Sequence, residues 1–195
     1  MSNYQQAPPA PTAAYTKAFN ALQHKRTKQA LNMLGGAEGA EYNTLFGGGT
    51  FKGFDRHPDT VVKTKNYASA AAGKYQIMPD TDEMISKVLN LYDFSPQSQD
   101  IKAVYLMQQR GVDPTQPMTR QMAAKLSPEW ASIPTMSGKS YYGQPVKTWN
   151  QLMKFYNSTP SIKNINLIKG GGEVELKIPE IIQTKPKENP LSIFK

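Results

Sequence analysis

The chain has 195 residues, a length that suits one domain with extensions and is sufficient to bury a hydrophobic core. It has no cysteine and only two histidines, which excludes a disulfide framework and disfavours a zinc site, so we expect neither a metal nor another cofactor. The net charge of +8 favours a polyanionic partner, either nucleic acid or an anionic cell-wall polymer; because the lysines are spread along the chain, we expect no nucleic acid partner.

The two ends of the chain differ in composition from its middle. Residues 1–14 are rich in proline, alanine and glutamine, and residues 159–195 combine three consecutive glycines with scattered prolines and lysines. Residues 173–178 alternate apolar and charged side chains, which predicts a strand there. We interpret both ends as extensions of a compact unit over residues 15–158.

Neither a membrane span nor a secretory signal is evident in the sequence. No apolar run approaches the roughly 20 residues that a membrane-spanning helix needs. The first fifteen residues lack the basic and then apolar pattern of a signal peptide. If the protein works outside the cytoplasm, we expect another factor to carry it there.

The first predicted helix leads into a glycine-rich segment. Apolar residues at helical spacing predict a helix over Tyr15–Leu34, ended by Gly35-Gly36. Residues 35–79 are rich in glycine and polar residues, with short β-prone pieces at Thr50-Phe51 and Thr60–Val62. This composition predicts loops and a hairpin, where a helical scaffold would carry a functional site.

The remaining predicted elements are helices. One covers residues 81–91 with Thr81 as a possible N-cap, and the next opens at Ser95-Pro96, a capping residue followed by proline. A fourth lies near residues 118–126, and a last one follows Pro145. The sequence therefore predicts an α+β, mainly helical domain with a small glycine-rich β-hairpin lobe.

Glu38 lies just after the first predicted helix, between small residues that would let a bulky ligand approach closely. Partial desolvation there would raise the pKa of the carboxyl group toward the working pH and suit it to general acid catalysis. The alternative is a solvated surface glutamate, as most glutamates are.

Further segments offer side chains that suit a sugar ligand. Tyr75 and Gln76 follow a run of small residues and supply an aromatic face and an amide; a packed turn is the alternative. His57 stands beside a proline, where a histidine is more often a structural hydrogen-bonding group than a catalyst. Trp130 and residues 141–144 either line a groove or cap the core.

Other site chemistries are missing from the sequence. There is no thiol nucleophile, and the ligands of an amidase-type zinc site are lacking. Glycines 47–49 are not followed by the lysine of a phosphate-binding loop, and no G-x-S-x-G motif of a serine hydrolase occurs.

Taken in chain order, four motifs resemble those of the lambda-type phage endolysin family (phage lysozymes and lytic transglycosylases). The motifs are Met33-Leu34-x-x-x-Glu38-Gly39 with Gly48-Gly49-x-Phe51 and Asp55-x-His57-Pro58, then Ala72-Gly73-Lys74-Tyr75-Gln76, then residues 93–100, and then residues 130–134 with Tyr142-Gly143-Gln144. Their common order extends over residues 24–157. On this basis we predict an N-terminal extension over residues 1–23, a lysozyme-like catalytic domain over 24–158 and a basic C-terminal extension over 159–195.

The resemblance implies a lysozyme-like fold and cleavage of the β-1,4 bond between N-acetylmuramic acid and N-acetylglucosamine in peptidoglycan, by lytic transglycosylation. It implies that Glu38 is the catalytic acid and base, and that glycan strands of the host cell wall are the partner. The substrate-binding side chains would be those of Tyr42, His57, Lys74, Tyr75, Gln76, Tyr142 and Gln144.

The carboxylates of the sequence agree with a single catalytic acid. Glycosidases with two carboxylates place the second one about 5 to 9.5 Å from the first. The nearby candidates Glu41, Asp55 and Asp59 have no feature that marks them as nucleophiles. We expect transglycosylation, with a hydrolytic muramidase as the alternative.

The extensions bear on where the protein works. One hypothesis is a component of the phage virion, held by other virion proteins through residues 1–23 and 159–195. The other is a free endolysin that waits in the host cytoplasm and reaches the wall at the end of infection. A third reading, an inactive virion structural protein with a lysozyme fold, is disfavoured by the presence of Glu38.

Overall fold

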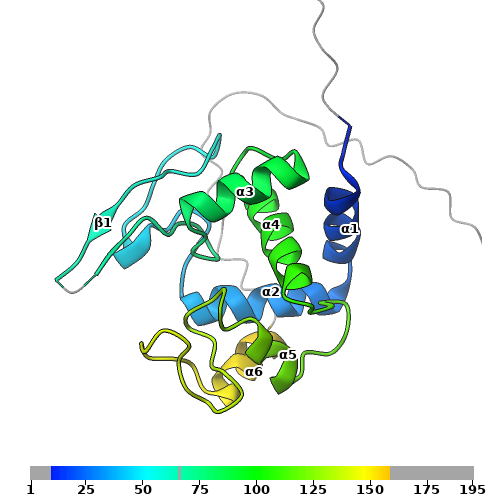
Figure 1. Cartoon of the computed structure of the whole chain (residues 1–195), viewed down its shortest axis with the longest axis vertical. Helices are drawn as coiled ribbons and strands as arrows, with labels where there is room; N and C mark the ends of the chain where they lie inside the picture. The colour runs from blue at the N-terminus through cyan, green and yellow to red at the C-terminus, as the bar shows by residue number, and fades with distance from the viewer. Residues whose placement is uncertain (1–9, 66, 159–195) are drawn as a thin grey trace, which may run out of the picture. The chain divides into compact units, whose positions relative to one another are not determined.

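Six α-helices and one short hairpin are found in the described part of the chain, residues 10–65 and 67–158 of a computed structural model (Figure 1). This mainly helical architecture with a two-stranded antiparallel sheet confirms the predicted fold class. The elements are α1 (Ala13–Leu22), α2 (Lys25–Glu38), the 3₁₀ turn η1 (Phe46–Gly48), β1 (Val62–Lys63), β2 (Ala68–Ser69), α3 (Pro79–Leu89), α4 (Pro96–Gln109), α5 (Arg120–Lys125) and α6 (Trp149–Asn157).

The single first helix that the sequence predicts is in fact two helices. The chain breaks after Leu22, and His24 adopts an extended conformation and caps α2 through its ring nitrogen. The basic residues that interrupt the apolar pattern form the first turn of α2. The break lets each helix turn its own apolar face toward the core, which one straight helix would not do.

The prediction that Gly35-Gly36 ends this helix was also wrong, because α2 continues to Glu38. These glycines serve close packing inside the helix. A Cβ atom on Gly35 would lie 2.7 Å from Cε of Lys74, and one on Gly36 would overlap the ring of Phe155 in α6. The residue that terminates the helix is Gly39, whose left-handed conformation (φ +67°) favours glycine.

The later helices begin close to where the sequence places them. Ser95 caps α4 with Pro96 in its first turn, as predicted. The helix predicted over residues 81–91 starts two residues earlier, at Pro79, because proline is well suited to the first helical turn. Thr81 therefore lies inside α3 and is not its N-cap.

The hydrophobic core lies between α2, α4 and the helices packed on them. Helix α2 contacts α6 and α4, while α1 contacts α4 and α3. Part of the predicted N-terminal extension thus joins the core, since Ala18 and Leu22 of α1 are buried. The largest fully buried side chains are those of Tyr75, Phe94, Lys102, Met33, Leu34, Ile85, Leu89, Ile101, Met107, Leu126, Ile133 and Leu152.

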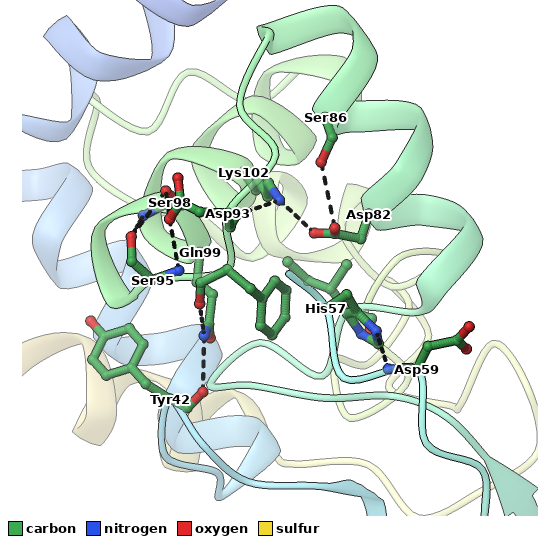
Figure 2. Close-up of polar contacts among 12 residues, drawn as sticks. Tyr42, His57, Asp59, Asp82, Ser86, Asp93, Ser95, Ser98, Gln99 and Lys102 are labelled. Carbon is green, nitrogen blue, oxygen red and sulfur yellow. Dashed lines mark hydrogen bonds and ion pairs between the residues drawn. The ribbon is translucent and has the colours of Figure 1, made fainter. Parts of the chain in front are cut away.

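A buried polar network joins α3 and α4 to the irregular lobe (Figure 2). Lys102, fully buried on α4, donates to the carboxylate of Asp82 on α3 at 2.7 Å and to the carbonyl of Asp93 at 3.0 Å. Gln99 donates to the carbonyl oxygen of Tyr42 at 2.9 Å and accepts from the backbone N–H of Lys74 at 2.9 Å. These bonds satisfy the buried polar groups and fix the lobe against the helices.

No helix of the described residues is long and apolar enough to cross a membrane. The predicted strand at residues 173–178 lies outside the described residues, as do residues 1–9 and the whole of the predicted C-terminal extension, 159–195.

Candidate active site

A cleft of about 390 Å³ opens beside the end of α2. Its walls come from α2, η1, the hairpin at β2, the segment over residues 71–78 and the loop between α5 and α6. The lining residues are Glu38, Phe46, Tyr67, Ala68, Ser69, Ala71, Gln76, Met78, Glu129, Trp130, Ala131, Tyr142 and Gln144. The cleft therefore combines a carboxyl group, aromatic faces and amides, which is the set of groups that binds sugars.

Glu38, the last residue of α2, places its carboxyl group in this cleft. Burial raises the pKa of Glu38, and its hydrogen bonds with Ser132 and the charge of Lys147 oppose that rise only in part. A carboxyl group of raised pKa remains partly protonated toward neutral pH and can give its proton to a leaving oxygen.

Ser132, which the sequence analysis did not select, is the direct partner of this carboxyl group. Its hydroxyl donates to Oε1 of Glu38 at 2.5 Å. The loop that carries it is fixed at both sides: Lys147 N–H donates to the carbonyl of Ser132 at 2.9 Å, and the indole N–H of Trp130 donates to the carbonyl of Tyr75 at 3.1 Å. The signal in the sequence was the Trp-Ala-Ser-Ile-Pro motif, of which only the aromatic residue was considered.

Glu129 is the other carboxylate among the lining residues, and it forms an ion pair with Arg110. Arg110 donates to its Oε2 from Nε at 3.0 Å and from a terminal nitrogen at 2.7 Å. The candidates considered from the sequence, Glu41, Asp55 and Asp59, do not line the cleft. Among the described residues, no group of three or more acidic and histidine side chains could hold a metal ion.

Three of the predicted substrate-binding residues share the cleft with Glu38. Gln76 has a left-handed backbone (φ +46°), a strained conformation for this residue, and its amide donates to the carbonyl of Gly73 at 2.9 Å. Tyr142 is 60% exposed, and its hydroxyl donates to the carbonyl of Pro128 at 2.6 Å, which fixes the ring at the cleft edge. Gln144 completes the group.

Three other predicted binding residues form a separate cluster around Asp100. Tyr42 and Tyr75 donate to the same carboxylate oxygen of Asp100 at 2.9 and 2.6 Å, and Lys74 donates to the Tyr42 hydroxyl at 3.2 Å. Burial raises the pKa of both tyrosines and of Asp100. Tyr75 is buried, whereas Tyr42 and Lys74 line a different hollow, so their positions point to support of the lobe.

The seventh predicted binding residue, His57, lies beside a hollow of about 670 Å³ that is lined by other residues than the cleft. Its Nδ1 accepts from the backbone N–H of Asp59 at 3.0 Å, and its Nε2 is 2.9 Å from the carbonyl of Ile77, so the neutral ring donates there. Burial lowers the pKa of His57. This arrangement fits a structural role more than substrate contact.

The fold and the cleft together define a lysozyme-like protein, and comparison with known proteins specifies the family. The endolysin family model matches residues 20–161, so the chain belongs to the endolysin family. It is accordingly a lysozyme-like, peptidoglycan-degrading enzyme of the phage type, which acts on the host cell wall.

Individual relatives agree with this family. The chain is 29% identical to the endolysin of Escherichia phage lambda over 157 residues, which covers 74% of this chain and 98% of that protein. The structure of bacteriophage lambda lysozyme complexed with a chitohexasaccharide matches with a TM-score of 0.63 and 29% identity, covering 68% of this chain and 92% of that one. A second structure of lysozyme from bacteriophage lambda gives a TM-score of 0.58 and 27% identity, with 68% and 90% covered.

Proposed function

We propose that the protein cleaves the β-1,4 bond between N-acetylmuramic acid and N-acetylglucosamine by lytic transglycosylation, with Glu38 as its only acid and base. The observation that carries this proposal is the state of the two carboxyl groups in the cleft. Glu38 is buried and has a raised pKa, whereas Glu129 is bound by Arg110. A mechanism that needs one free carboxyl group suits this cleft better than one that needs two.

In the proposed reaction, Glu38 first donates a proton and then accepts one. Protonated Glu38 gives its proton to the glycosidic oxygen as the bond from C1 of the muramic acid to that oxygen breaks. The C6 hydroxyl of the same muramic acid then attacks C1, and its proton passes to the Glu38 carboxylate. The product carries a 1,6-anhydro ring, and Glu38 is protonated again for the next cycle.

The rest of the cleft would bind the glycan strand. Gln76 and Gln144 offer amides to the N-acetyl and hydroxyl groups, and the ring of Tyr142 offers a face on which a sugar can stack. The lambda lysozyme of similar fold was solved with a chitohexasaccharide, a chain of N-acetylated sugars, which supports a ligand of this class here.

The mass of the products distinguishes transglycosylation from hydrolysis. Digestion of purified sacculi should release muropeptides with anhydromuramic ends, each lighter by one water than the hydrolysed product. Mass spectrometry measures this difference directly. Reducing ends of the hydrolysed mass as the main product would contradict the proposal and establish a muramidase.

The role of Glu38 is tested by the variant Glu38→Gln, which keeps the shape of the side chain and removes the proton. Because general acid catalysis contributes about 10²- to 10⁴-fold, we expect sacculus clearing to slow by at least about 100-fold. Circular dichroism should show an unchanged fold. Equal clearing by both proteins would exclude Glu38 as the acid, and no clearing by either would favour an inactive structural protein.

The setting in which the enzyme works is a separate proposal. We propose that the extensions predicted over residues 1–23 and 159–195 attach the protein to other virion proteins; residues 1–9 and 159–195 of these lie outside the described residues. Their composition, which offers little to an independent core, supports attachment to a partner. Proteomics of gradient-purified phage particles tests this, and the absence of the protein from particles would favour a free endolysin in the host cytoplasm.

A further inference from the structure

The β1–β2 hairpin carries an unbalanced positive charge. Lys63 and Lys65 lie in or beside its strands, and the sequence has no acidic residue from Thr60 to Pro79. Both lysine side chains are exposed, and in the described part of the chain neither forms an ion pair. Their charges are therefore available to a ligand.

The same hairpin forms one wall of the cleft. Tyr67, Ala68 and Ser69 line the cleft with Glu38, and Figure 1 shows the hairpin extending away from the helices. Lys63 is the cross-strand partner of Ala68, and directly opposite residues of an antiparallel pair point to the same face. Lys63 therefore lies across the strand pair from a residue of the cleft wall, and Lys65 lies two residues before Tyr67, which also lines the cleft.

Packing of the hairpin does not require these lysines. The turn between the strands is closed by a hydrogen bond from the backbone N–H of Thr64 to the carbonyl of Tyr67 at 2.7 Å, and by the Thr64 hydroxyl. Val62 and Thr64, which alternate with the lysines along the chain, approach Gly47 of η1. The hairpin is thus stabilised by its turn and its contact with η1, and the charge of the lysines suits another purpose.

The chemistry of the substrate indicates which ligand these charges fit. Resting on the proposed function, the sugars in the cleft are N-acetylated and neutral, while the lactyl group of each muramic acid in intact wall carries a short peptide with free carboxylates. The negative charges nearest to a bound glycan strand are those of its own peptides. Opposite charges beside a binding cleft improve both encounter and selectivity.

We infer that the hairpin recognises the acidic peptides of peptidoglycan, with Lys63 and Lys65 binding the peptide carboxylates of the strand that lies in the cleft. The lysines contact substrate away from the scissile bond. They would make the enzyme select peptide-bearing glycan over glycan that lacks peptides.

Binding to two ligands tests this inference in the background of Glu38→Gln, where nothing is cleaved. The first ligand is a soluble glycan oligomer that carries its peptides, and the second is chitohexaose, which has no carboxylate. For Lys63→Glu/Lys65→Glu we expect affinity for the peptide-bearing oligomer to fall about 10-fold at low salt, and less at high salt. Affinity for chitohexaose should remain within about twofold.

A matched control is the charge reversal of Lys25 and Lys154, which are exposed on α2 and α6 and do not line the cleft. This variant loses the same net charge and should bind both ligands like the parent protein. An equal loss in the control would show general attraction by net charge, and an equal loss of chitohexaose binding would show a damaged cleft. Either result overturns the inference.

The test does not depend on the outcome of the proposed transglycosylation. The product masses report on the reaction, whereas these affinities report on recognition by an inactive variant. A hydrolysed product with a 10-fold peptide preference would reject the first proposal and retain the second.

Discussion

Glu38 and Ser132 form the pair of side chains on which catalysis is expected to depend. Burial raises the pKa of the Glu38 carboxyl group, while the Ser132 hydroxyl lowers it by donating at 2.5 Å. The two effects together set the fraction of Glu38 that is protonated at a given pH. The same hydrogen bond fixes the direction in which the carboxyl group faces the cleft.

Ser132→Ala should therefore change both rate and pH dependence. Losing one hydrogen bond to a carboxyl group is expected to lower kcat/KM about 10-fold or more. The pKa of Glu38 should rise, which moves the alkaline limb of the pH–rate profile to higher pH. Kinetics from pH 4 to 9 on labelled sacculi measure this.

The conservative variant Ser132→Thr serves as the control, because it keeps the hydroxyl and should restore most of the rate. A loss of kcat/KM in Ser132→Ala with an unmoved alkaline limb would mean that Ser132 merely shapes its loop.

His57 gives a second prediction at the residue scale, on the pH dependence of stability. Because the folded-state pKa of His57 is lowered, the unfolded chain binds the proton first. The contribution of His57 to stability is fully present above its unfolded pKa of about 6.5 and is lost as the pH falls toward its folded value. In His57→Gln, the free energy of unfolding should fall less steeply between pH 7 and 5, as urea titrations would show.

The comparison of wild type with His57→Gln isolates the contribution of His57 to the pH dependence of stability. Glu38 and Asp100 have raised pKa values, so they act in the opposite direction in the acid range, but they are present in both proteins. Identical slopes for wild type and variant would contradict a lowered pKa of His57 in the folded protein.

At the scale of elements, the contact between α2 and α6 depends on a glycine. Alanine in place of glycine usually stabilises a helix by about 0.5–1 kcal/mol. In Gly36→Ala the added methyl group would overlap the ring of Phe155, so we expect destabilisation by about 1–3 kcal/mol. Chemical denaturation measures whether the free energy of unfolding of Gly36→Ala falls or rises. The double variant Gly36→Ala/Phe155→Leu should recover part of the loss, and strict additivity of the two changes would contradict this packing.

The same glycines show why helix ends were predicted less well than helices. Gly35-Gly36 reads as a helix terminator, but the space that it leaves is filled by Lys74 and Phe155, which are distant in sequence. Such close packing overrides local propensity and leaves no local signal. Where no distant packing opposes the local signal, as at Ser95-Pro96, the start of the helix was predicted correctly.

At the scale of the whole molecule, the packing of helix α1 bears on where the folded domain begins. The catalytic domain predicted from motifs starts at residue 24, yet α1 buries Ala18, Ala21 and Leu22 against its neighbours. A chain that begins at residue 24 should melt about 5 °C or more below one that begins at residue 10, as calorimetry would show. Equal melting temperatures would mean that α1 is an independent extension.

The candidate site was predictable where motifs carry chemistry and not where chain segments meet. Glu38, Gln76, Tyr142 and Gln144 come from motif segments, and the structure brings them to one cleft. Neither Ser132 beside Glu38 nor the cluster around Asp100 could be inferred, because both depend on three-dimensional contacts between distant segments. Lys74 and Tyr75 share a motif with Gln76, but their side chains, like that of Tyr42, lie at the cluster around Asp100.

The hydrogen bond between Ser132 and Glu38 spans 94 residues of sequence and has a consequence for synthesis. A ribosome makes the acid long before the hydroxyl that orients it, and long-range contacts of this kind close late in folding. A nascent chain or a fragment that ends before residue 132 therefore carries Glu38 without its partner. Such a chain also lacks α6, which packs against α2, so the carboxyl group reaches its final orientation only after residues 132–157 have been made.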